Sequence, residues 1–311
     1  MGSDAADGRA ARRAVETVAA VSRALPALRG KQKLARWAMG RAEARGSLHG
    51  SWSLHLKDGT RLELPRQSLM TWEVAFTGSY DLDIVTRVAQ FVRSGTLVLD
   101  VGASLGLWTV QLGKIAAARG ARLWAFEPNP ANTPWIARNV ALNGLQDTVR
   151  THEVGLGDRA ESATLVGVEH GVGNGVIVRV NSKAPADYGK HPKISVSLRR
   201  LDEIELPARV SFIKLDIEGF EPAFMRGAAQ LIARDRPVIY GEFAPRWLAR
   251  RREDLGVLLA GLDYDVRRIV QVRGGQARRS GNLPETEPLD LEGPKRLRRN
   301  LLLCPRERHA A

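Results

Sequence analysis

The stretch VLDVGASLG, residues 98–106, decides the fold of this 311-residue chain. An apolar strand runs into Asp100, and glycines follow at 102 and 106, just before a helix that we expect to begin near Leu107. Glycine lets the backbone turn sharply and approach another group where a side chain would collide. A helix N-terminus presents N–H groups and a positive dipole end to an anion. This order of strand, glycine loop and helix predicts a ligand-binding turn in an α/β sheet.

The spacing of the glycines distinguishes between two ligands. Dinucleotide enzymes carry G-x-G-x-x-G, which from Gly102 requires glycines at 104 and 107, where this chain has Ser104 and Leu107. The NAD interpretation therefore fails on its own pattern. The loop instead suits the methionine end of S-adenosylmethionine, with Asp100 placed to attract its ammonium group directly or through water.

Two further acids follow the next strands. The strand LWAFEP ends in Glu127, 27 residues beyond Asp100, where a carboxylate can accept hydrogen bonds from both ribose hydroxyls. A strand near residue 154 gives way to Gly157 and Asp158, and this aspartate could accept a proton of the adenine amine. Each acid also has a structural interpretation, Glu127 as a solvated strand end and Asp158 as a turn residue.

An acidic cluster follows a third strand, in FIKLDIEGFEP, residues 212–222. Asp216, Glu218 and Glu221 lie where this strand passes into a helix, and ligands of doubly wound sheets bind at the carboxyl ends of strands. We expect Asp216 or Glu218 to accept the proton of an acceptor hydroxyl, and Glu242, at the end of the next strand, to orient the acceptor. The alternative, favoured for Glu221, is that a carboxylate only stabilises the helix N-terminus.

Other groups compete for this chemistry. His170 and His191 lie in the polar segment between residues 159 and 209 and are rival bases, although a lone histidine in such a loop is more often inert. The acidic cluster could also hold a divalent cation such as Mg²⁺ that polarises the hydroxyl. We favour the carboxylate base over both alternatives.

A regular alternation of apolar strands and amphipathic helices contains these motifs. Continuously apolar strands separated by helices indicate a parallel sheet covered on both faces. The expected strands are Leu97–Val101, Leu123–Phe126, Val149–Val154, Val210–Leu215, Val238–Phe243, Asp265–Val270 and Leu301–Leu303, and the expected helices cover residues 107–118, 131–143, 221–233 and 246–261. An antiparallel insertion at about residues 159–209 interrupts the alternation, with a hairpin signal at Asn174-Gly175 and a strand at Ile194–Leu198.

The N-terminal part of the chain has a different pattern. Helical spacing extends over residues 10–45, where Pro26 divides it, and returns over Leu82–Val92. Between these helices, an alternating pattern around Asp58-Gly59 predicts a hairpin within residues 51–64.

Basic residues collect at the two ends of the chain, whose net charge is +13. Residues 1–50 hold ten basic against four acidic residues and residues 266–311 hold eleven against five, so the segment with the motifs is almost neutral. We expect a basic helical extension at 1–50 and a main domain at 51–311 with its core at 75–245. The extension packs on the domain or, alternatively, forms a lid or a peripheral membrane contact.

Cysteine usage and hydropathy indicate the compartment. Cys304 is the only cysteine, so no intrachain disulfide can form, and no apolar run approaches the roughly 20 residues that span a bilayer. Both features favour a reducing, cytoplasmic compartment. A single cysteine also excludes a zinc site built from paired cysteines.

The ordered motifs resemble the FkbM-type methyltransferase family over roughly residues 75–245. They are VLDVGASLG, AFEPNP, NVALNG, VGLGD, SVSLRRLDEI, FIKLDIEGFE and PVIYGEF, of which K-x-D-x-E-G-x-E is the most specific. The resemblance implies a class I, Rossmann-like methyltransferase fold with a doubly wound, mostly parallel seven-stranded sheet. It also implies S-adenosylmethionine as methyl donor and O-methylation of a sugar, glycan or secondary metabolite. The chain departs from the family at Tyr80-Asp81, where Tyr-Glu is frequent.

Motifs and resemblance together define the expected site. Its catalytic residues are Asp216, Glu218 and Glu242, and its cofactor-binding residues are Asp100, Gly102, Ala103, Ser104, Gly106, Glu127, Pro128, Asn129, Gly157 and Asp158.

Two other functions compete with this interpretation. Amino-group DNA methylases carry an Asn/Asp-Pro-Pro-aromatic motif after the fourth strand, where this chain reads Asp-Ile-Glu-Gly. Carbon-5 cytosine methylases need a nucleophilic cysteine near the same position, and the only cysteine here, Cys304, is remote from it. An acidic cluster would also repel the phosphates of a nucleic acid. Nucleic acid is therefore disfavoured as a partner. A non-catalytic binding or scaffold protein of the same fold would not need the glycine loop and the acids.

Overall fold

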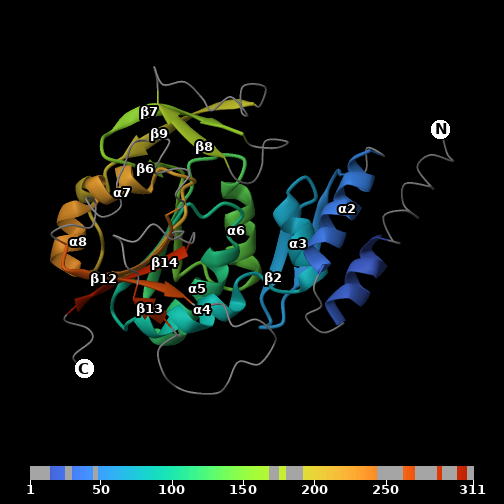
Figure 1. Ribbon diagram of the computed structural model, residues 1–311, viewed down its shortest axis with the longest axis horizontal. Helices are drawn as coiled ribbons and strands as arrows, with labels where there is room; N and C mark the ends of the chain where they lie inside the picture. Colours follow the sequence, from blue (N-terminus) through green and yellow to red (C-terminus); the bar gives the residue numbers. More distant parts are fainter. Residues whose placement is uncertain are drawn as a thin grey trace. The chain divides into compact units, whose positions relative to one another are not determined.

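The computed structural model describes residues 15–24, 30–44, 48–167, 175–179, 192–243, 262–269, 286–288 and 300–306. Among the described residues, those up to residue 82 form one compact unit and those from residue 83 onward form a second (Figure 1). The first unit thus includes the hairpin region as well as the N-terminal helices. All the motifs of the expected site belong to the second unit.

The first unit combines helices with a two-stranded hairpin. Residues 15–24 are helical, and the following elements are α2 (Lys31–Glu43), β1 (Ser51–His55), β2 (Arg61–Pro65) and α3 (Leu69–Thr77). The antiparallel pairing of β1 with β2 confirms the expected hairpin. Asp58 sets its turn, because the carboxylate accepts hydrogen bonds from the N–H and the hydroxyl of Thr60 at 3.0 and 2.8 Å.

A mixed sheet forms the centre of the second unit. Within the described residues it has eight strands in the order β13-β12-β14-β11-β10-β3-β4-β5. Their bounds are β3 (Leu97–Val101), β4 (Arg122–Phe126), β5 (Val149–His152), β10 (Val210–Leu215), β11 (Val238–Glu242), β12 (Tyr264–Ile269), β13 (Thr286–Pro288) and β14 (Asn300–Pro305). The seven expected strands are all present with small shifts of their ends, and β13 is an eighth that we did not expect. The strands from β11 to β5 in this order are parallel, whereas β14 is antiparallel to its neighbours β11 and β12.

Side chains alternate between the two faces of this sheet. Leu99 and Ile213 belong to the large buried core that includes Phe224 on one side. Asp100 and Lys214, one position further along the same two strands, therefore point to the opposite face, and they are partners in the β3–β10 register. This face is covered too, so the sheet holds two facing charged side chains in its interior.

Helices cover the sheet as the alternation predicts, with one difference. The expected helices near 107 and 131 are confirmed as α5 (Leu107–Arg119) and α6 (Thr133–Leu142), and the one at 82–92 as α4 (Leu82–Val88) with a 3-10 turn, η1 (Ala89–Phe91). The expected single helix at 221–233 is wrong, because it is divided into α7 (Glu221–Gly227) and α8 (Ala229–Asp235). The helix expected at 246–261 lies outside the described residues.

Close packing explains the division between α7 and α8. A Cβ on Gly227 would lie 2.7 Å from the carbonyl carbon of Gly157, so the end of α7 rests directly on another backbone segment. The next residue, Ala228, has φ −117° and leaves the helical region.

A smaller sheet forms the insertion. It contains β6 (Gly155–Leu156), β7 (Glu161–Val166), β8 (Val176–Arg179) and β9 (Lys193–Arg199), in the order β6-β9-β7-β8. β7 is antiparallel to both β8 and β9, which confirms the antiparallel insertion. Figure 1 shows this sheet at one end of the second unit, with β6 next to α7. Leu165 and Leu198 of the insertion share a small core with Phe220 and Ala223, so the insertion buttresses the segment where α7 begins.

Candidate active site

Two loops meet where the strand order changes direction. β3 has β4 and β5 on one side and β10 and β11 on the other. The loop after β3, residues 102–106, and the loop after β10, residues 216–220, therefore leave the same edge of the sheet as neighbours. We call them the glycine loop and the acidic loop. In open α/β sheets, ligands bind at this topological switch point.

Gly102 is the point of contact between these loops. Its φ of 80° lies in the left-handed region that favours glycine. A Cβ here would overlap the carbonyl oxygen of Asp216 and lie 2.9 Å from the carbonyl carbon. The Asp216 N–H donates to the carbonyl oxygen of Val101 at 3.0 Å. The absence of a side chain at Gly102 thus admits the backbone of the acidic loop, and the expected contact of this glycine with the cofactor stays a prediction.

Backbone hydrogen bonds hold the rest of the glycine loop. The N–H groups of Gly102 and Ala103 both donate to the carbonyl oxygen of Phe126, at 2.9 and 3.1 Å. Ser104 has a left-handed φ of 51°, a conformation that concentrates at functional sites in residues other than glycine. α5 then begins directly after Gly106 without a side-chain cap. The loop is thus preformed, and it delivers a helix N-terminus to the carboxyl edge of the sheet.

Glu127 lies almost fully buried just after β4. One carboxylate oxygen accepts the N–H of Ser104 at 2.7 Å, and the other accepts the N–H of Asn129 at 2.9 Å and the side-chain amide of Asn132 at 3.2 Å. Burial raises the pKa of Glu127 to about 7, and these N–H donors lower it only in part. Three of its roughly four acceptor positions are used, so about one remains for a ligand hydroxyl.

Asp100 and Lys214 form a buried ion pair beneath the glycine loop. Nζ of Lys214 lies 3.4 Å from Oδ1 of Asp100, and the hydroxyl of Thr109 on α5 donates to Oδ2 at 2.6 Å. The ammonium group also donates to the carbonyl oxygen of Gly102 at 2.8 Å and lies 3.8 Å from Oδ2 of Asp216. Asp100 is fully buried, and its expected contact with the cofactor ammonium stays a prediction.

The acidic loop has an unusual backbone that Glu221 holds in place. Glu218 and Gly219 have left-handed φ angles of 50° and 91°. Oε1 of the buried Glu221 accepts the N–H groups of Ile217 and Gly219, each at 3.1 Å. Burial raises the pKa of Glu221 to about 7, although these backbone donors lower it. Glu221 therefore has the structural role at the start of its helix that we favoured for it.

The three predicted catalytic acids end two adjacent strands. Asp216 and Glu218 follow β10, and Glu242 is the last residue of β11, which pairs with β10. All three are partly exposed at this edge. Their position therefore allows contact with a ligand, and their roles stay predictions.

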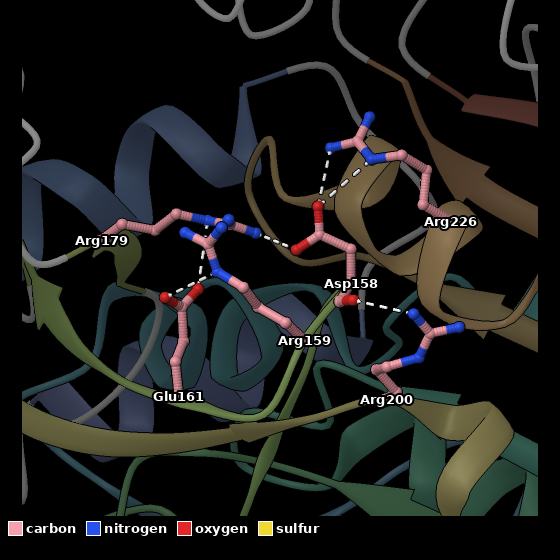
Figure 2. A network of polar contacts seen from close by, with 6 residues as sticks. All are labelled: Asp158, Arg159, Glu161, Arg179, Arg200 and Arg226. Atoms are coloured by element: carbon pink, nitrogen blue, oxygen red, sulfur yellow. Dashed lines mark hydrogen bonds and ion pairs between the residues drawn. The ribbon is translucent and has the colours of Figure 1, made fainter.

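Asp158 lies in an ionic network (Figure 2). Its carboxylate pairs with Arg179 of β8 and with Arg226 of α7, the latter at 3.2 Å, and its carbonyl oxygen accepts from Arg200 at 3.2 Å. Burial alone would raise the pKa of Asp158, but the guanidinium groups of Arg179 and Arg226 outweigh it and lower the pKa below its ordinary value. Figure 2 shows Arg179 and Arg226 approaching this carboxylate from two separate elements. The adenine contact of Asp158 stays a prediction.

The remaining predicted residues lie beside these groups. Asn129 is fully buried after Pro128, where it contacts Glu127 as described above. A Cβ on Gly157 would lie 2.8 Å from the ring of Phe220, so this glycine lets the acidic loop pack against the insertion. His170 and His191 lie outside the described residues. Across the part of the chain that the structure describes, no group of three or more His, Cys, Asp or Glu side chains is arranged to hold a metal ion.

Sequence reasoning assigned no role to several residues that hold this site. Lys214 carried a usable signal, because a charged residue inside an apolar strand is rarely buried unless it is paired. Thr109 and Asn132 carried none, since threonine and asparagine are common on helices. Neither did Asn139 of α6, whose buried side-chain amide donates to the carbonyl oxygen of Leu105 at 3.2 Å and supports the glycine loop.

Comparisons with known proteins identify similar chains. Methyltransferase sdnD of Sordaria araneosa is 26% identical over 159 residues, which are 43% of this chain and 61% of the relative. Methyltransferase 1 of Beauveria bassiana is 27% identical over 162 residues, which are 47% of this chain and 63% of the relative. The chain thus spans about three fifths of the length of these curated relatives.

Solved structures give similarities at lower identity. The FkbM methyltransferase of Methylobacillus flagellatus KT is 19% identical with a TM-score of 0.41, covering 68% of this chain and 43% of that one. The tRNA (uracil-54, C5)-methyltransferase of Pyrococcus abyssi, solved with S-adenosyl-L-homocysteine, is 15% identical with a TM-score of 0.39, covering 70% of this chain and 38% of that one.

The match to a family model covers more of the chain than the matches to these curated relatives. Residues 100–272 match the family described as the methyltransferase FkbM domain. This range is more than half of the chain, and it contains the glycine loop, Glu127, the insertion and the acidic loop. The chain therefore belongs to the FkbM methyltransferase domain family.

Proposed function

We propose that the protein transfers the methyl group of S-adenosylmethionine to a hydroxyl group of a sugar, glycan or secondary metabolite. The observation that supports this best is the direct contact between Gly102 and Asp216. It joins a loop suited to the cofactor with a loop that carries carboxylates able to accept a proton. Family membership supports the same reaction class.

The described residues fit this cofactor. The uncapped N-terminus of α5 suits its carboxylate, because N–H groups and the helix dipole favour an anion there. Glu127 keeps about one acceptor position for a ribose hydroxyl, one contact fewer than we expected from the sequence. The segment around Gly157 and Asp158 remains our candidate for adenine.

The acidic loop suits the binding and deprotonation of the acceptor hydroxyl. The bound cofactor supplies an electrophilic methyl carbon, and holding the acceptor oxygen in line with it provides much of the rate. As the oxygen–carbon bond forms and the carbon–sulfur bond breaks, the hydroxyl proton must leave. Asp216 or Glu218 accepts that proton, and Glu242 orients the acceptor.

Two alternatives have less support. A nucleic-acid acceptor would bring phosphates to an edge that carries Asp216, Glu218 and Glu242. A non-catalytic scaffold would not require the strained Ser104 and Glu218.

We also propose a cytoplasmic location and a peripheral membrane contact through the N-terminal helices. No helix in the described ranges is long and apolar enough to cross a membrane. On α2, Leu34 and Trp37 are 39% and 61% exposed, and the Arg41 guanidinium lies 5.3 Å from the Trp37 ring centre. Exposed apolar side chains next to basic ones suit an anionic lipid surface.

Radiolabel transfer from S-adenosylmethionine tests the proposed reaction. The acceptors are hydroxyl-bearing sugars and phenols, each with an analogue in which an amine replaces the hydroxyl. We expect label on oxygen only, so that phenols are labelled and their aniline analogues are not, and labelled amino sugars carry an O-methyl group that NMR identifies. Asp216→Asn should abolish turnover while the cofactor product still binds, so full activity in that variant would refute the proposed base. Transfer to the amines alone would overturn O-methylation.

A further inference from the structure

Lys214 is a charged residue in the interior of a central strand. Only 6% of its side chain is exposed, and charged side chains are almost never so buried unless they are paired. Its Nζ atom has three oxygen neighbours: the carbonyl of Gly102 at 2.8 Å, Asp100 at 3.4 Å and Asp216 at 3.8 Å. The first contact is a hydrogen bond and the other two are ion pairs.

The three contacts connect separate parts of the site. Gly102 belongs to the glycine loop, Asp216 to the acidic loop, and Asp100 anchors the lysine from β3. Burial alone would lower the pKa of Lys214, but Asp100 and Asp216, helped by Glu127, raise it above its ordinary value. The ammonium is therefore charged, and it offsets part of the negative charge that these carboxylates bring to the edge of the sheet.

We propose that Lys214 is a positioning residue that fixes the glycine loop against the acidic loop and sets the charge of the cofactor site. This inference rests on the proposed function. S-adenosylmethionine carries a positive sulfonium, whereas its product S-adenosylhomocysteine is neutral. Without the ammonium, the carboxylates would bind the sulfonium too strongly relative to the product and stabilise the ground state.

Calorimetric titration of the full chain with both compounds tests this assignment. The variants are Lys214→Met, which removes the charge at similar length, and the double variant Lys214→Met with Asp100→Asn. Asp100→Asn alone is the reference for the double variant, because we predict that Asp100 contacts the cofactor ammonium. The double variant removes one positive and one negative charge, so the net charge of the site is unchanged and no buried carboxylate is left unpaired. Thermal unfolding checks that each variant is folded.

The two proposed contributions of Lys214, holding the glycine loop and setting the charge of the cofactor site, change different measured quantities. Affinity for S-adenosylhomocysteine should fall about tenfold in Lys214→Met relative to wild type, and in the double variant relative to Asp100→Asn, because the glycine loop loses its donor. The ratio of S-adenosylmethionine affinity to S-adenosylhomocysteine affinity should rise about tenfold in Lys214→Met and stay near the wild-type value in the double variant. If Lys214 contributed packing alone, the ratio of the two affinities would change equally in Lys214→Met and in the double variant.

Each outcome decides a specific point. Wild-type affinities in a folded Lys214→Met variant, or equal ratios in Lys214→Met and the double variant, overturn the assignment. If Lys214→Met does not fold, the double variant is compared with Asp100→Asn alone: weaker binding of S-adenosylhomocysteine by the double variant supports the assignment, and equal binding overturns it. A folded wild type that binds neither compound contradicts the proposed function itself.

Discussion

At the scale of single residues, two buried carboxylates have pKa values far from their ordinary range. Burial raises the pKa of Glu127 and of Glu221 from 4.5 to about 7. Between these values the folded chain binds more protons at the two sites than the unfolded chain does. Their contribution to stability is therefore complete below about pH 4.5 and is lost as the pH rises through 7.

Glu221→Gln isolates one of these contributions. Glutamine keeps an oxygen for the N–H groups of Ile217 and Gly219, so the variant resembles the protonated wild type. We expect similar free energies of unfolding at pH 4.5 and a variant that is more stable by roughly 1–3 kcal/mol at pH 7.5. Urea denaturation at both pH values measures the difference. A difference that does not change with pH would contradict the raised pKa.

Gly102→Ala tests the contact between the loops. The added Cβ meets the backbone of Asp216, so we expect a loss of about 3 kcal/mol or more in the free energy of unfolding. Gly144→Ala is the matched control, because its φ of 65° is also left-handed but nothing lies within 4 Å of the added Cβ. It should cost only about 1–2 kcal/mol. Equal losses in the two variants would mean that the loops do not depend on close contact at Gly102.

At the scale of elements, the network around Asp158 joins β8 and α7. Asp158→Ala leaves Arg179, which is partly buried, with Glu161 but without Asp158 as a partner. We therefore expect a loss of roughly 1–3 kcal/mol in the free energy of unfolding and faster hydrogen exchange in β8. Arg159→Ala is the control, since its exposed side chain pairs only with Glu161 among the contacts of Figure 2. Its effect should be within about 0.5 kcal/mol.

Asp158→Ala and a further variant, Arg226→Ala, separate the two roles of Asp158. Arg226→Ala weakens the network but keeps the carboxylate. If Asp158 contacts adenine, S-adenosylhomocysteine binds normally to Arg226→Ala and weakly to a folded Asp158→Ala variant. Equal affinities in the two variants would leave Asp158 with its structural role alone.

The exposed face of α2 predicts membrane association. The 311-residue chain should sediment with vesicles that contain an anionic lipid and not with purely zwitterionic ones, and Trp37→Ser should weaken this binding several-fold. Arg159→Ala, a change in the other unit, should have no effect. Equal binding of wild type and Trp37→Ser to anionic vesicles would exclude a role for this tryptophan.

Periodicity predicted most of the elements because it reports local patterns. The strand into Asp100, the helix from Leu107 and the hairpin around Asp58 all follow from residues close in sequence. The division of the helix after Gly227 could not be predicted, since it depends on contact with a backbone segment about 70 residues earlier. β13 is too short to show a period of its own.

At the scale of the whole molecule, the candidate site also combines features that follow from local sequence with contacts between distant segments. Ordered motifs at the ends of successive strands predicted which loops meet, because the doubly wound topology brings those ends to one edge. The partners inside the site could not be predicted in this way. Lys214 and Asp100 are 114 residues apart and meet only through the β3–β10 register.

The position of the cofactor at the junction of the two loops is tested most directly by titrating the full chain with S-adenosylhomocysteine at pH 8 and pH 6. We expect binding on the order of micromolar at pH 8. Binding should be up to about tenfold weaker at pH 6, because a ribose hydroxyl prefers the ionised Glu127, whose pKa in the free chain is about 7. Glu127→Gln should bind weakly at both pH values. A folded wild type that binds at neither pH would contradict a cofactor site at this junction.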